Sequence, residues 1–409
     1  MNIAVAQSGG PTCAINASLV GVFRQALLTE EIDAVFGSIN GIEGMITDEL
    51  INLKTIIRTN RDMELLRQTP STVLGSCRYK LPAYEDDPDV YEKIHKTLET
   101  HRISIFLYIG GNDSMDTVVK LSAYMKHIGS DIKIVGIPKT IDNDLPITDH
   151  TPGFGSAAKY VAATTQEIIR DSSVYSIPSV TIIEIMGRHS GWLAASTCVL
   201  RVNGEEAPHL IYLPESDFSA EQFIEDVRKE MAKHKAVIVA VSEGISLNAE
   251  NSGIEEFQSG ATDVFGHKYL SGVGKFLETL VAKEIGCKVR SIELNVMQRC
   301  SSHICSKTDI DEAERIGRQA LRVALDGNTG IMMYFRRVSD VPYAVSIDMT
   351  EASNVANLEK MFPAEWISAE QNQVTDAAIP YFLPLIQGEV DIFMDNGMPV
   401  HFQRPLQMR

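Results

Sequence analysis

The chain has 409 residues, 44% of them hydrophobic, and a formal net charge of −17. A chain of this length and hydrophobicity is expected to bury cores in two lobes rather than to stay disordered. The acidic charge argues against nucleic acid and against an anionic membrane surface as partners. The chain has no run of about 18 apolar residues, so no membrane span is predicted. A strand is predicted from the first residues on, so we expect no signal peptide. We therefore expect a cytoplasmic protein, in which six cysteines do not predict a disulfide framework.

Two strand–glycine–helix units are predicted in the first third of the chain. In the first, a strand at 2–6 leads through the turn 8–12 into a helix at 14–28. In the second, a strand at 103–109 leads through Gly110 and Gly111 into a helix at 115–127. Such turns let backbone N–H groups and a helix dipole approach an anion, although glycine also serves tight packing. Neither turn matches a dinucleotide fingerprint or a P-loop.

The next predicted strand, at 132–137, is followed by the most informative stretch of the chain. Residues 138–144 combine the cation Lys139 and the hydroxyl of Thr140 with the carboxylates of Asp142 and Asp144. Side chains at the carboxyl end of a parallel strand face the crevice where open α/β sheets bind ligands. A carboxylate there can accept a proton from a hydroxyl while its neighbours hold a metal or a phosphate. A capped loop is the alternative, because Asp and Asn are common turn residues.

The rest of the chain continues the alternation of strands and helices. We expect strands at 179–185, 210–213 and 236–241, helices at 192–200, 220–233, 269–285 and 309–325, and a hairpin at 330–336 and 343–348. This pattern is typical of a parallel α/β architecture. Residues 244–274 are expected to form an exposed insertion or lid. Residues 350–409 carry no chemical motif, and their apolar stretch 380–386 is expected to be buried.

Collinear motifs between residues 8 and 299 resemble those of the 6-phosphofructokinases, in particular the variant that uses pyrophosphate rather than ATP. The motifs are Ser8-Gly9-Gly10, Gly75-Ser76-Cys77-Arg78, Gly110-Gly111-Asn112-Asp113, Pro138-Lys139-Thr140-Ile141-Asp142-Asn143-Asp144, Met186-Gly187-Arg188, Pro214-Glu215, Ser242-Glu243 and Gln298-Arg299. The resemblance implies an α/β fold of two interleaved Rossmann-like lobes with mostly parallel sheets. It also implies an active site in the cleft between the lobes and a homodimer or homotetramer.

The resemblance gives roles to the matched positions. Asp142 looks like the general base that takes the proton from the 1-hydroxyl of fructose 6-phosphate, and Arg188 is placed near the transferring phosphoryl group. Gly10, Arg78 and Gly111 match donor contacts, while Asn112 and Asp144 are the candidates to hold Mg²⁺. The positions that would bind the sugar phosphate are Thr140, Ile141, Asp142, Met186, Gly187, Arg188, Glu243, Arg290, Val296, Met297, Gln298 and Arg299.

Donor choice is expected to depend on Asp113 and Lys139, because relatives that use ATP carry glycine at both positions. A carboxylate at position 113 occupies the space of the ATP α-phosphate and repels it. Lys139 adds positive charge where charge develops during phosphoryl transfer. The resemblance therefore implies a reversible pyrophosphate-dependent transfer to fructose 6-phosphate. An ATP-dependent kinase and a non-catalytic metabolite-binding regulator are the alternatives.

Three positions depart from the family pattern. Asn112 stands where many relatives have a magnesium-binding aspartate, and Val296 stands where a histidine is common. Ser179 replaces an arginine that in bacterial ATP enzymes reaches the sugar phosphate across a subunit interface. Candidates to compensate are Arg290, Arg299, Lys307 and His303. A relaxed pocket leaves sedoheptulose 7-phosphate open as an additional substrate.

The motifs also predict how the chain is divided. Residues 1–145 are expected to form the donor-binding lobe with the catalytic loop, and residues 146–330 the lobe that binds the sugar phosphate. Residues 331–409 are expected to form a C-terminal hairpin and a segment for packing or for subunit contact.

Overall fold

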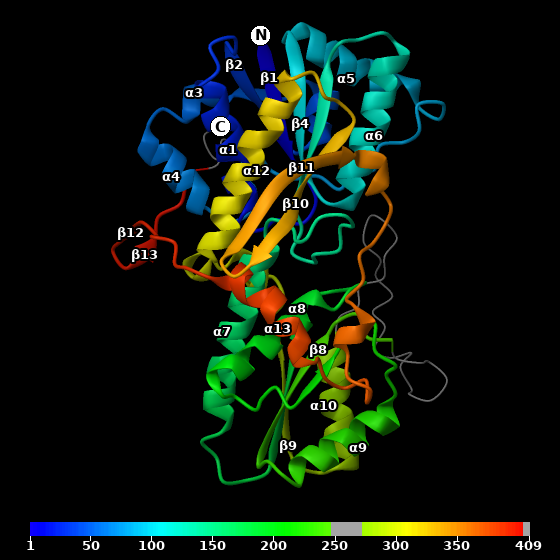
Figure 1. Cartoon of the computed structure of the whole chain (residues 1–409), viewed down its shortest axis with the longest axis vertical. Helices are drawn as coiled ribbons and strands as arrows, with labels where there is room; N and C mark the ends of the chain where they lie inside the picture. Colours follow the sequence, from blue (N-terminus) through cyan, green and yellow to red (C-terminus); the bar gives the residue numbers. More distant parts are fainter. Residues whose placement is uncertain (247–271, 404–409) are drawn as a thin grey trace.

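The computed structural model describes residues 1–246 and 272–403 and shows two lobes, one above the other along the long axis of the molecule (Figure 1). The first lobe contains a seven-stranded sheet in the order β11-β10-β5-β4-β1-β2-β3, and the second a four-stranded sheet in the order β7-β8-β6-β9. The strands of the first sheet are β1 (Asn2–Gln7), β2 (Ala34–Ser38), β3 (Leu50–Asn52), β4 (Ile103–Gly110), β5 (Lys133–Pro138), β10 (Ile331–Asp340) and β11 (Tyr343–Glu351). Those of the second are β6 (Ser179–Ile185), β7 (Leu210–Tyr212), β8 (Ala236–Ser242) and β9 (Lys288–Glu293).

Helices cover the sheets, and the described part of the chain ends in a small hairpin. The helices are α1 (Ile15–Leu27), α2 (Ile42–Thr47), α3 (Leu53–Ile56), α4 (Asn60–Gln68), α5 (Pro88–Thr100), α6 (Asn112–His127), α7 (Phe154–Ser172), α8 (Trp192–Ala195), α9 (Ala220–Met231), α10 (Val273–Glu284), α11 (Met297–Cys300), α12 (Lys307–Leu325) and α13 (Ile379–Phe382). The hairpin consists of β12 (Met394–Asp395) and β13 (Met398–Pro399). No helix within these described ranges is long and apolar enough to cross a membrane.

The central strands of the first sheet are buried on both faces because they alternate between two apolar cores. Ile3 and Val5 of β1 pack with α1 and α12, while Ala4 and Ala6 point to the opposite core, with α5 and α6. Helices α1 and α12 approach closely through glycine: a Cβ on Gly317 would lie only 2.1 Å from the carbonyl oxygen of Ser18. The sheet thus holds the carboxyl ends of β1, β4 and β5 in fixed positions.

The second sheet is built in the same way. Ile183 and Ile185 of β6 face the core formed with α7 and α8, whereas Val180 and Ile182 face the core with α9 and α10. All three pairings in this sheet are parallel. The carboxyl ends of β6 and β8 therefore meet at one edge.

The predicted hairpin is confirmed, since β10 and β11 pair antiparallel, but it does not form a separate segment. Ile331 of β10 pairs in parallel with Val135 of β5, so the hairpin completes the first sheet.

Helix α12, expected in the second lobe, packs in the first because its Ile316 and Leu321 belong to the same core as Ile3. The strands and cores thus divide the chain differently from the predicted boundaries at 145 and 330.

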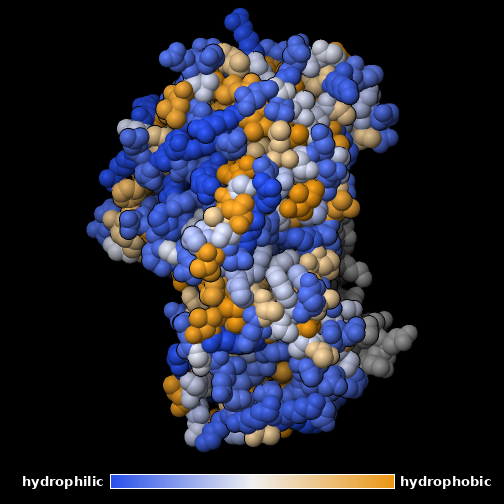
Figure 2. Space-filling view, in the orientation of Figure 1, coloured by the Kyte–Doolittle hydropathy of each residue, from blue (hydrophilic) through white to orange (hydrophobic). Residues whose placement is uncertain are grey.

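After β11 the chain returns to the second lobe, where α13 lies beside α7 and α8 (Figure 1). Phe382 and Leu385 are buried there, as expected for the stretch 380–386. Most of the lid predicted at 244–274 lies outside the described residues. Hydrophilic residues predominate on the face shown in Figure 2, with hydrophobic ones interspersed.

Candidate active site

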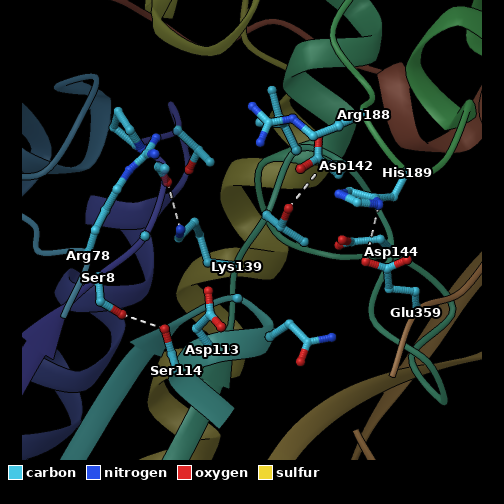
Figure 3. Close-up of a pocket in the computed structure, with 18 of the residues that line it drawn as sticks. Ser8, Arg78, Asp113, Ser114, Lys139, Asp142, Asp144, Arg188, His189 and Glu359 are labelled. Atoms are coloured by element: carbon cyan, nitrogen blue, oxygen red, sulfur yellow. Dashed lines mark hydrogen bonds and ion pairs between the residues drawn. The ribbon is translucent and has the colours of Figure 1, made fainter. Parts of the chain in front are cut away.

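A cavity of about 670 Å³ lies where strands from both lobes end. The first lobe contributes the loops after β1, β4 and β5, and the second lobe the loops after β6 and β8. The predicted site residues that line this cavity are Gly10, Arg78, Gly111, Asn112, Asp113, Lys139, Thr140, Ile141, Asp142, Asp144, Met186, Arg188, Glu243 and Arg299. Figure 3 shows the side chains of Arg78, Lys139, Asp142 and Arg188 around this common space.

Lys139 is the buried cation at the first-lobe wall of the cavity. Its backbone N–H donates to the carbonyl of Gly110 at 2.9 Å, which continues the pairing of β5 with β4. Its side chain is 2% exposed, and Nζ donates to the carbonyl oxygen of Gly10 at 2.6 Å. Burial lowers the pKa of Lys139 to about 8, while Asp142 acts in the opposite direction. The group is therefore still mainly charged at neutral pH, beside the first glycine turn.

The two glycine turns are fixed against each other below Lys139. Ser8 and Ser114 hydroxyls lie 2.5 Å apart, as the dashed line in Figure 3 shows. Gly9 has a φ of 72°, and a Cβ there would lie 3.2 Å from Nζ of Lys139. A Cβ on Gly10 would lie 3.4 Å from Nη1 of Arg299. Glycine at both positions thus lets two cations approach the turn closely.

Asp113 follows the second glycine turn, that of Gly110 and Gly111. It is the second residue of α6, its side chain is exposed, and it lines the cavity in front of Lys139 (Figure 3). A carboxylate in the first turn of a helix is favoured by the helix dipole. The helix N-terminus thus carries a fixed negative charge at the rim of the cavity.

The loop after β5 presents Asp142 to the cavity. The backbone N–H of Asp142 donates to Oγ1 of Thr140 at 3.1 Å, and its carbonyl accepts from Oγ of Ser190 at 3.2 Å. Burial raises the pKa of Asp142, and Lys139 and Arg188 partly offset this rise. A half-buried carboxylate of raised pKa, held by its own backbone, is suited to accept a proton from a hydroxyl.

Two further carboxylates of the cavity have raised pKa values. Burial and the neighbouring charge of Asp142 raise the pKa of Asp144 to about 7. The same two causes raise the pKa of Glu243 to about 7. The charge of Asp142 thus makes ionisation of both neighbouring carboxylates harder.

The second-lobe wall is held by contacts behind the cavity. The backbone N–H of Met186 donates to Oε1 of Gln298 at 3.2 Å, and Ser242 Oγ donates to the carbonyl of Gly187 at 2.5 Å. Glu243 continues the β6–β8 pairing through a 2.8 Å bond from its N–H to the carbonyl of Ile185. Gln298 and Gly187 therefore shape the wall without lining it.

Other predicted substrate positions lie away from the cavity of this chain. Arg290 is on the outer strand β9 and pairs with Asp171 at 3.2 Å. Val296 and Met297 are 46% and 48% exposed at the surface. The structure thus brings Arg299 to the cavity but not these three residues, whose binding roles stay predictions.

The two predicted metal ligands, Asp144 and Asn112, differ in their surroundings. Asp144 faces the cavity, whereas the amide of Asn112 is engaged with backbone: its Nδ2 donates to the carbonyl of Leu358, and its Oδ1 accepts from the N–H of Asn357. Within the described part of the chain, no cluster of three His, Cys, Asp or Glu side chains could by itself hold a metal ion. Magnesium, however, is usually held by one or two carboxylates together with substrate phosphates.

Several residues that line the cavity were not predicted from the sequence. Tyr79, Lys80 and His189 follow matched motifs directly, so extending each motif by two residues would have included them. The segment 357–359 also lines the cavity, and it comes from the part of the chain without motifs. Only the fold brings this segment to the site, where Glu359 Oε1 lies 3.8 Å from Nδ1 of His189.

Known proteins resemble this chain over nearly its whole length. Residues 2–324 match the Phosphofructokinase family. The pyrophosphate–fructose 6-phosphate 1-phosphotransferases of Halomonas elongata and Xanthomonas campestris are 37% and 40% identical, each over 97% of this chain and 94% of the relative. The crystal structure of a pyrophosphate-dependent phosphofructokinase from Nitrosospira multiformis superposes with a TM-score of 0.87 at 34% identity, covering 99% of this chain and 96% of that one. The chain therefore belongs to the phosphofructokinase family.

Proposed function

We propose that this protein catalyses the reversible transfer of a phosphoryl group from pyrophosphate to the 1-hydroxyl of D-fructose 6-phosphate. The products are fructose 1,6-bisphosphate and orthophosphate, which places the enzyme in glycolysis and gluconeogenesis. The observation that carries this proposal is the convergence of Lys139, Asp142 and Asp113 on one cavity. The names of relatives that match 97% of the chain agree with it.

The reaction needs a base, an acceptor oxygen and stabilisation of phosphate charge. The oxygen of the sugar 1-hydroxyl attacks one phosphorus of pyrophosphate, and Asp142 accepts the proton of that hydroxyl. The bond from that phosphorus to the bridging oxygen breaks, and orthophosphate leaves with the bridging electron pair. Lys139 and Arg188 stabilise the charge that spreads over the phosphoryl oxygens, which is the main contribution of proteins to this chemistry.

Donor choice follows from the charge at the rim. A nucleotide would have to place a further phosphate next to Asp113 at the N-terminus of α6. Two like charges at such a contact disfavour binding. Pyrophosphate has no further phosphate that would reach Asp113, and the buried positive charge of Lys139 attracts it. In this proposal Gly10, Arg78 and Gly111 contact the donor.

The sugar phosphate binds on the side of the second lobe. Met186, Glu243 and Arg299 line this side of the cavity, and burial lowers the pKa of Arg299. Glu243 accepts hydrogen bonds from sugar hydroxyls, and Arg299 binds the 6-phosphate. The backbone N–H of Met186, oriented by Gln298, supports the wall.

The carboxylates fit a magnesium ion held jointly with the donor. Asp144 has a raised pKa because it is buried beside Asp142, and a cation would relieve the mutual repulsion. When bound, Mg²⁺ would neutralise phosphate charge. Asp144 is the main candidate ligand, and the hydrogen-bonded amide of Asn112 is the weaker one.

We infer further that the enzyme works in the cytoplasm as a homodimer or homotetramer. Val174, Tyr175 and Ile177 are exposed apolar residues in one loop, and large exposed apolar surface often marks an interface. Lys288 of β9 lies 4.4 Å above the ring of Tyr175, so this loop adjoins the strand that carries Arg290. Because Arg290 lies outside its own cavity, a role in binding the 6-phosphate requires a second copy of the chain.

The product spectrum tests the proposed reaction. Purified protein is incubated with pyrophosphate, fructose 6-phosphate and Mg²⁺, and the phosphorus NMR spectrum is followed. We expect equal amounts of orthophosphate and of a new phosphate ester at carbon 1, and pyrophosphate should re-form from fructose 1,6-bisphosphate and phosphate. Release of orthophosphate without the ester, or ester formation only with ATP, would overturn the proposal.

A further inference from the structure

The catalytic loop is held from behind by the C-terminal third of the chain. After β11 the chain passes the N-terminus of α6, where Asn112 binds the backbone of residues 357 and 358. Asn357 Nδ2 also donates to Asp116 at 3.0 Å. Three residues later, the backbone N–H of Lys360 donates to the carbonyl oxygen of Asp144 at 2.7 Å. The segment thus connects the first turn of α6 directly with the loop that carries Asp142.

The ammonium of Lys360 points into the base of this loop rather than into the cavity. Its Nζ donates to the carbonyl oxygens of Thr148 and Asp149 at 3.0 and 2.9 Å. The ammonium also lies 5.0 Å above the ring of Trp192, whose Nε1 donates to the carbonyl of Lys360 at 3.1 Å. The lysine is therefore fixed by both lobes through a cation–π contact and hydrogen bonds.

Asn143 connects this cation to the reacting groups. It lies between Asp142 and Asp144, is fully buried and has a left-handed φ of 56°. Its Oδ1 accepts from Lys360 Nζ at 3.5 Å and from the N–H of Thr151 at 3.1 Å. Its Nδ2 donates to the hydroxyl of Tyr381 at 2.7 Å. A residue in this conformation persists only when its surroundings determine it, and here two side chains of the C-terminal third do so.

Tyr381 completes the arrangement. Its hydroxyl donates to the carbonyl of Asp149 at 2.6 Å, so Tyr381 and Lys360 share that acceptor. Neither side chain lines the cavity. Both can therefore act on the reaction without touching the substrate, through the conformation of residues 142–149.

We propose that Lys360 is a positioning residue whose ammonium holds Asn143 and the carbonyls of residues 148 and 149 so that Asp142 and Asp144 face the cavity. This inference rests on the proposed phosphoryl transfer. Small displacements of a reacting group lower the rate steeply, because the productive geometry must already exist when the substrate binds. Substrate contacts themselves do not involve Lys360, so binding should change little.

The first test replaces the ammonium and keeps the stem. Lys360→Met should lower kcat by roughly 10- to 100-fold, with KM for pyrophosphate and for fructose 6-phosphate changed less than about threefold. Lys54→Met is the matched control, because Lys54 Nζ also donates to two carbonyl oxygens, those of Ile32 and Asp33, both at 2.9 Å, and none of these residues lines the cavity. A control with unchanged kcat supports the inference; an equal loss in both variants overturns it.

A second pair of measurements separates positioning from lost stability. Tyr381→Phe removes only a hydroxyl and should lower kcat several-fold. The melting temperature is measured as a control, and if it changes, kcat is corrected for the fraction of folded protein. In an Asp142→Asn background, Lys360→Met should cause less than about a threefold further loss, because both act through the same carboxylate. Full additivity of the two losses, or an unaltered rate in Tyr381→Phe, contradicts the inference.

The wild-type protein keeps this test distinct from that of the proposed function. A wild type without transfer from pyrophosphate overturns the proposed function and the inference with it. An active wild type together with an equally active and folded Lys360→Met variant overturns the inference alone.

Discussion

Lys139 and Asp142 are opposite charges in one half-enclosed space, and each changes the ionisation of the other. Burial disfavours both charged forms, which lowers the pKa of Lys139 to about 8 and raises that of Asp142. Their mutual attraction opposes both shifts. A lysine with this pKa is still charged at neutral pH, and a carboxylate with a raised pKa is a stronger base than an exposed aspartate.

The role of Asp142 predicts a large loss of rate on removal of its charge. Asp142→Asn keeps the size of the side chain but cannot accept the hydroxyl proton, so kcat should fall by about 100-fold or more. Steady-state rates with pyrophosphate and fructose 6-phosphate measure the loss. Asp131→Asn, an exposed position outside the cavity, is the control and should keep the full rate. A fully active Asp142→Asn would exclude Asp142 as the base.

The donor-site charges predict the behaviour of a double variant. Asp113→Gly combined with Lys139→Gly should lower kcat/KM for pyrophosphate by roughly 100-fold, because the charge that stabilises the phosphoryl group is lost. Asp113→Asn alone, which removes charge at constant size, should retain most of this activity and admit ATP more readily. A double variant with the wild-type rate on pyrophosphate would contradict the assigned roles.

At the scale of residues, the sequence predicts the side chains at strand ends but not those brought in by the fold. Lys139 and Asp142 could be predicted because they follow a buried strand directly. Lys360 and Glu359 could not, since their segment has no motif and reaches the site only through the path of the chain after β11. Arg290 matches a motif position, yet its strand lies at the outer edge of the second sheet.

At the scale of elements, a buried ionic network joins α12, the β10–β11 hairpin and the loop after β5. The ring of His150 lies 2.9 Å from Oδ2 of Asp149 and 2.7 Å from Oε2 of Glu312, and it stacks on Phe335 at 4.7 Å. Burial alone would lower the pKa of His150, but these two hydrogen bonds raise it to about 9. The network therefore binds a proton more tightly when folded than when unfolded.

This linkage predicts how stability depends on pH. Because the folded pKa of about 9 lies above the unfolded value of 6.5, the contribution of His150 is fully present below pH 6.5. It is lost as pH rises from 6.5 through 9, by up to about 3 kcal/mol. Denaturant titrations of the wild type and of His150→Gln at several pH values measure it. The difference in free energy of unfolding should shrink across this window.

The comparison with His150→Gln also removes other titrations from the result. Lys139 and Lys360 have lowered pKa values of about 8, so their effects have the opposite sign and overlap the same window. Both lysines are present in both proteins and cancel in the difference. A difference that stays constant or grows between pH 6.5 and 9 would refute the assigned role of His150.

Helices and strands could be predicted where the pattern of apolar residues is local. Which elements pair or pack together could not be predicted in this way. The hairpin at β10 and β11 follows from two largely apolar runs around a turn, but nothing in those residues shows that β10 pairs with β5 rather than forming a separate unit. Similarly, the amphipathic pattern of α12 predicts a helix, while its position against α1 depends on the glycines that allow close contact. Long-range pairing is a property of the whole chain.

At the scale of the molecule, a protein of net charge −17 gathers cations at one cavity between two lobes. Lys139 and Arg188 follow strands β5 and β6, Arg78 lies in the loop between α4 and α5, and Arg299 lies in the short helix α11. Anionic substrates are thus attracted by the local field of the cavity against the overall charge. The lobes provide opposite walls, and the C-terminal segment connects them behind the catalytic loop.

The most direct measurement of the central claim is the ratio of kcat/KM for pyrophosphate to kcat/KM for ATP, with fructose 6-phosphate and Mg²⁺ held constant. Because a further phosphate would meet the carboxylate of Asp113, we predict a ratio of at least about 100 in favour of pyrophosphate. Equal use of the two donors, or a preference for ATP, would contradict the account.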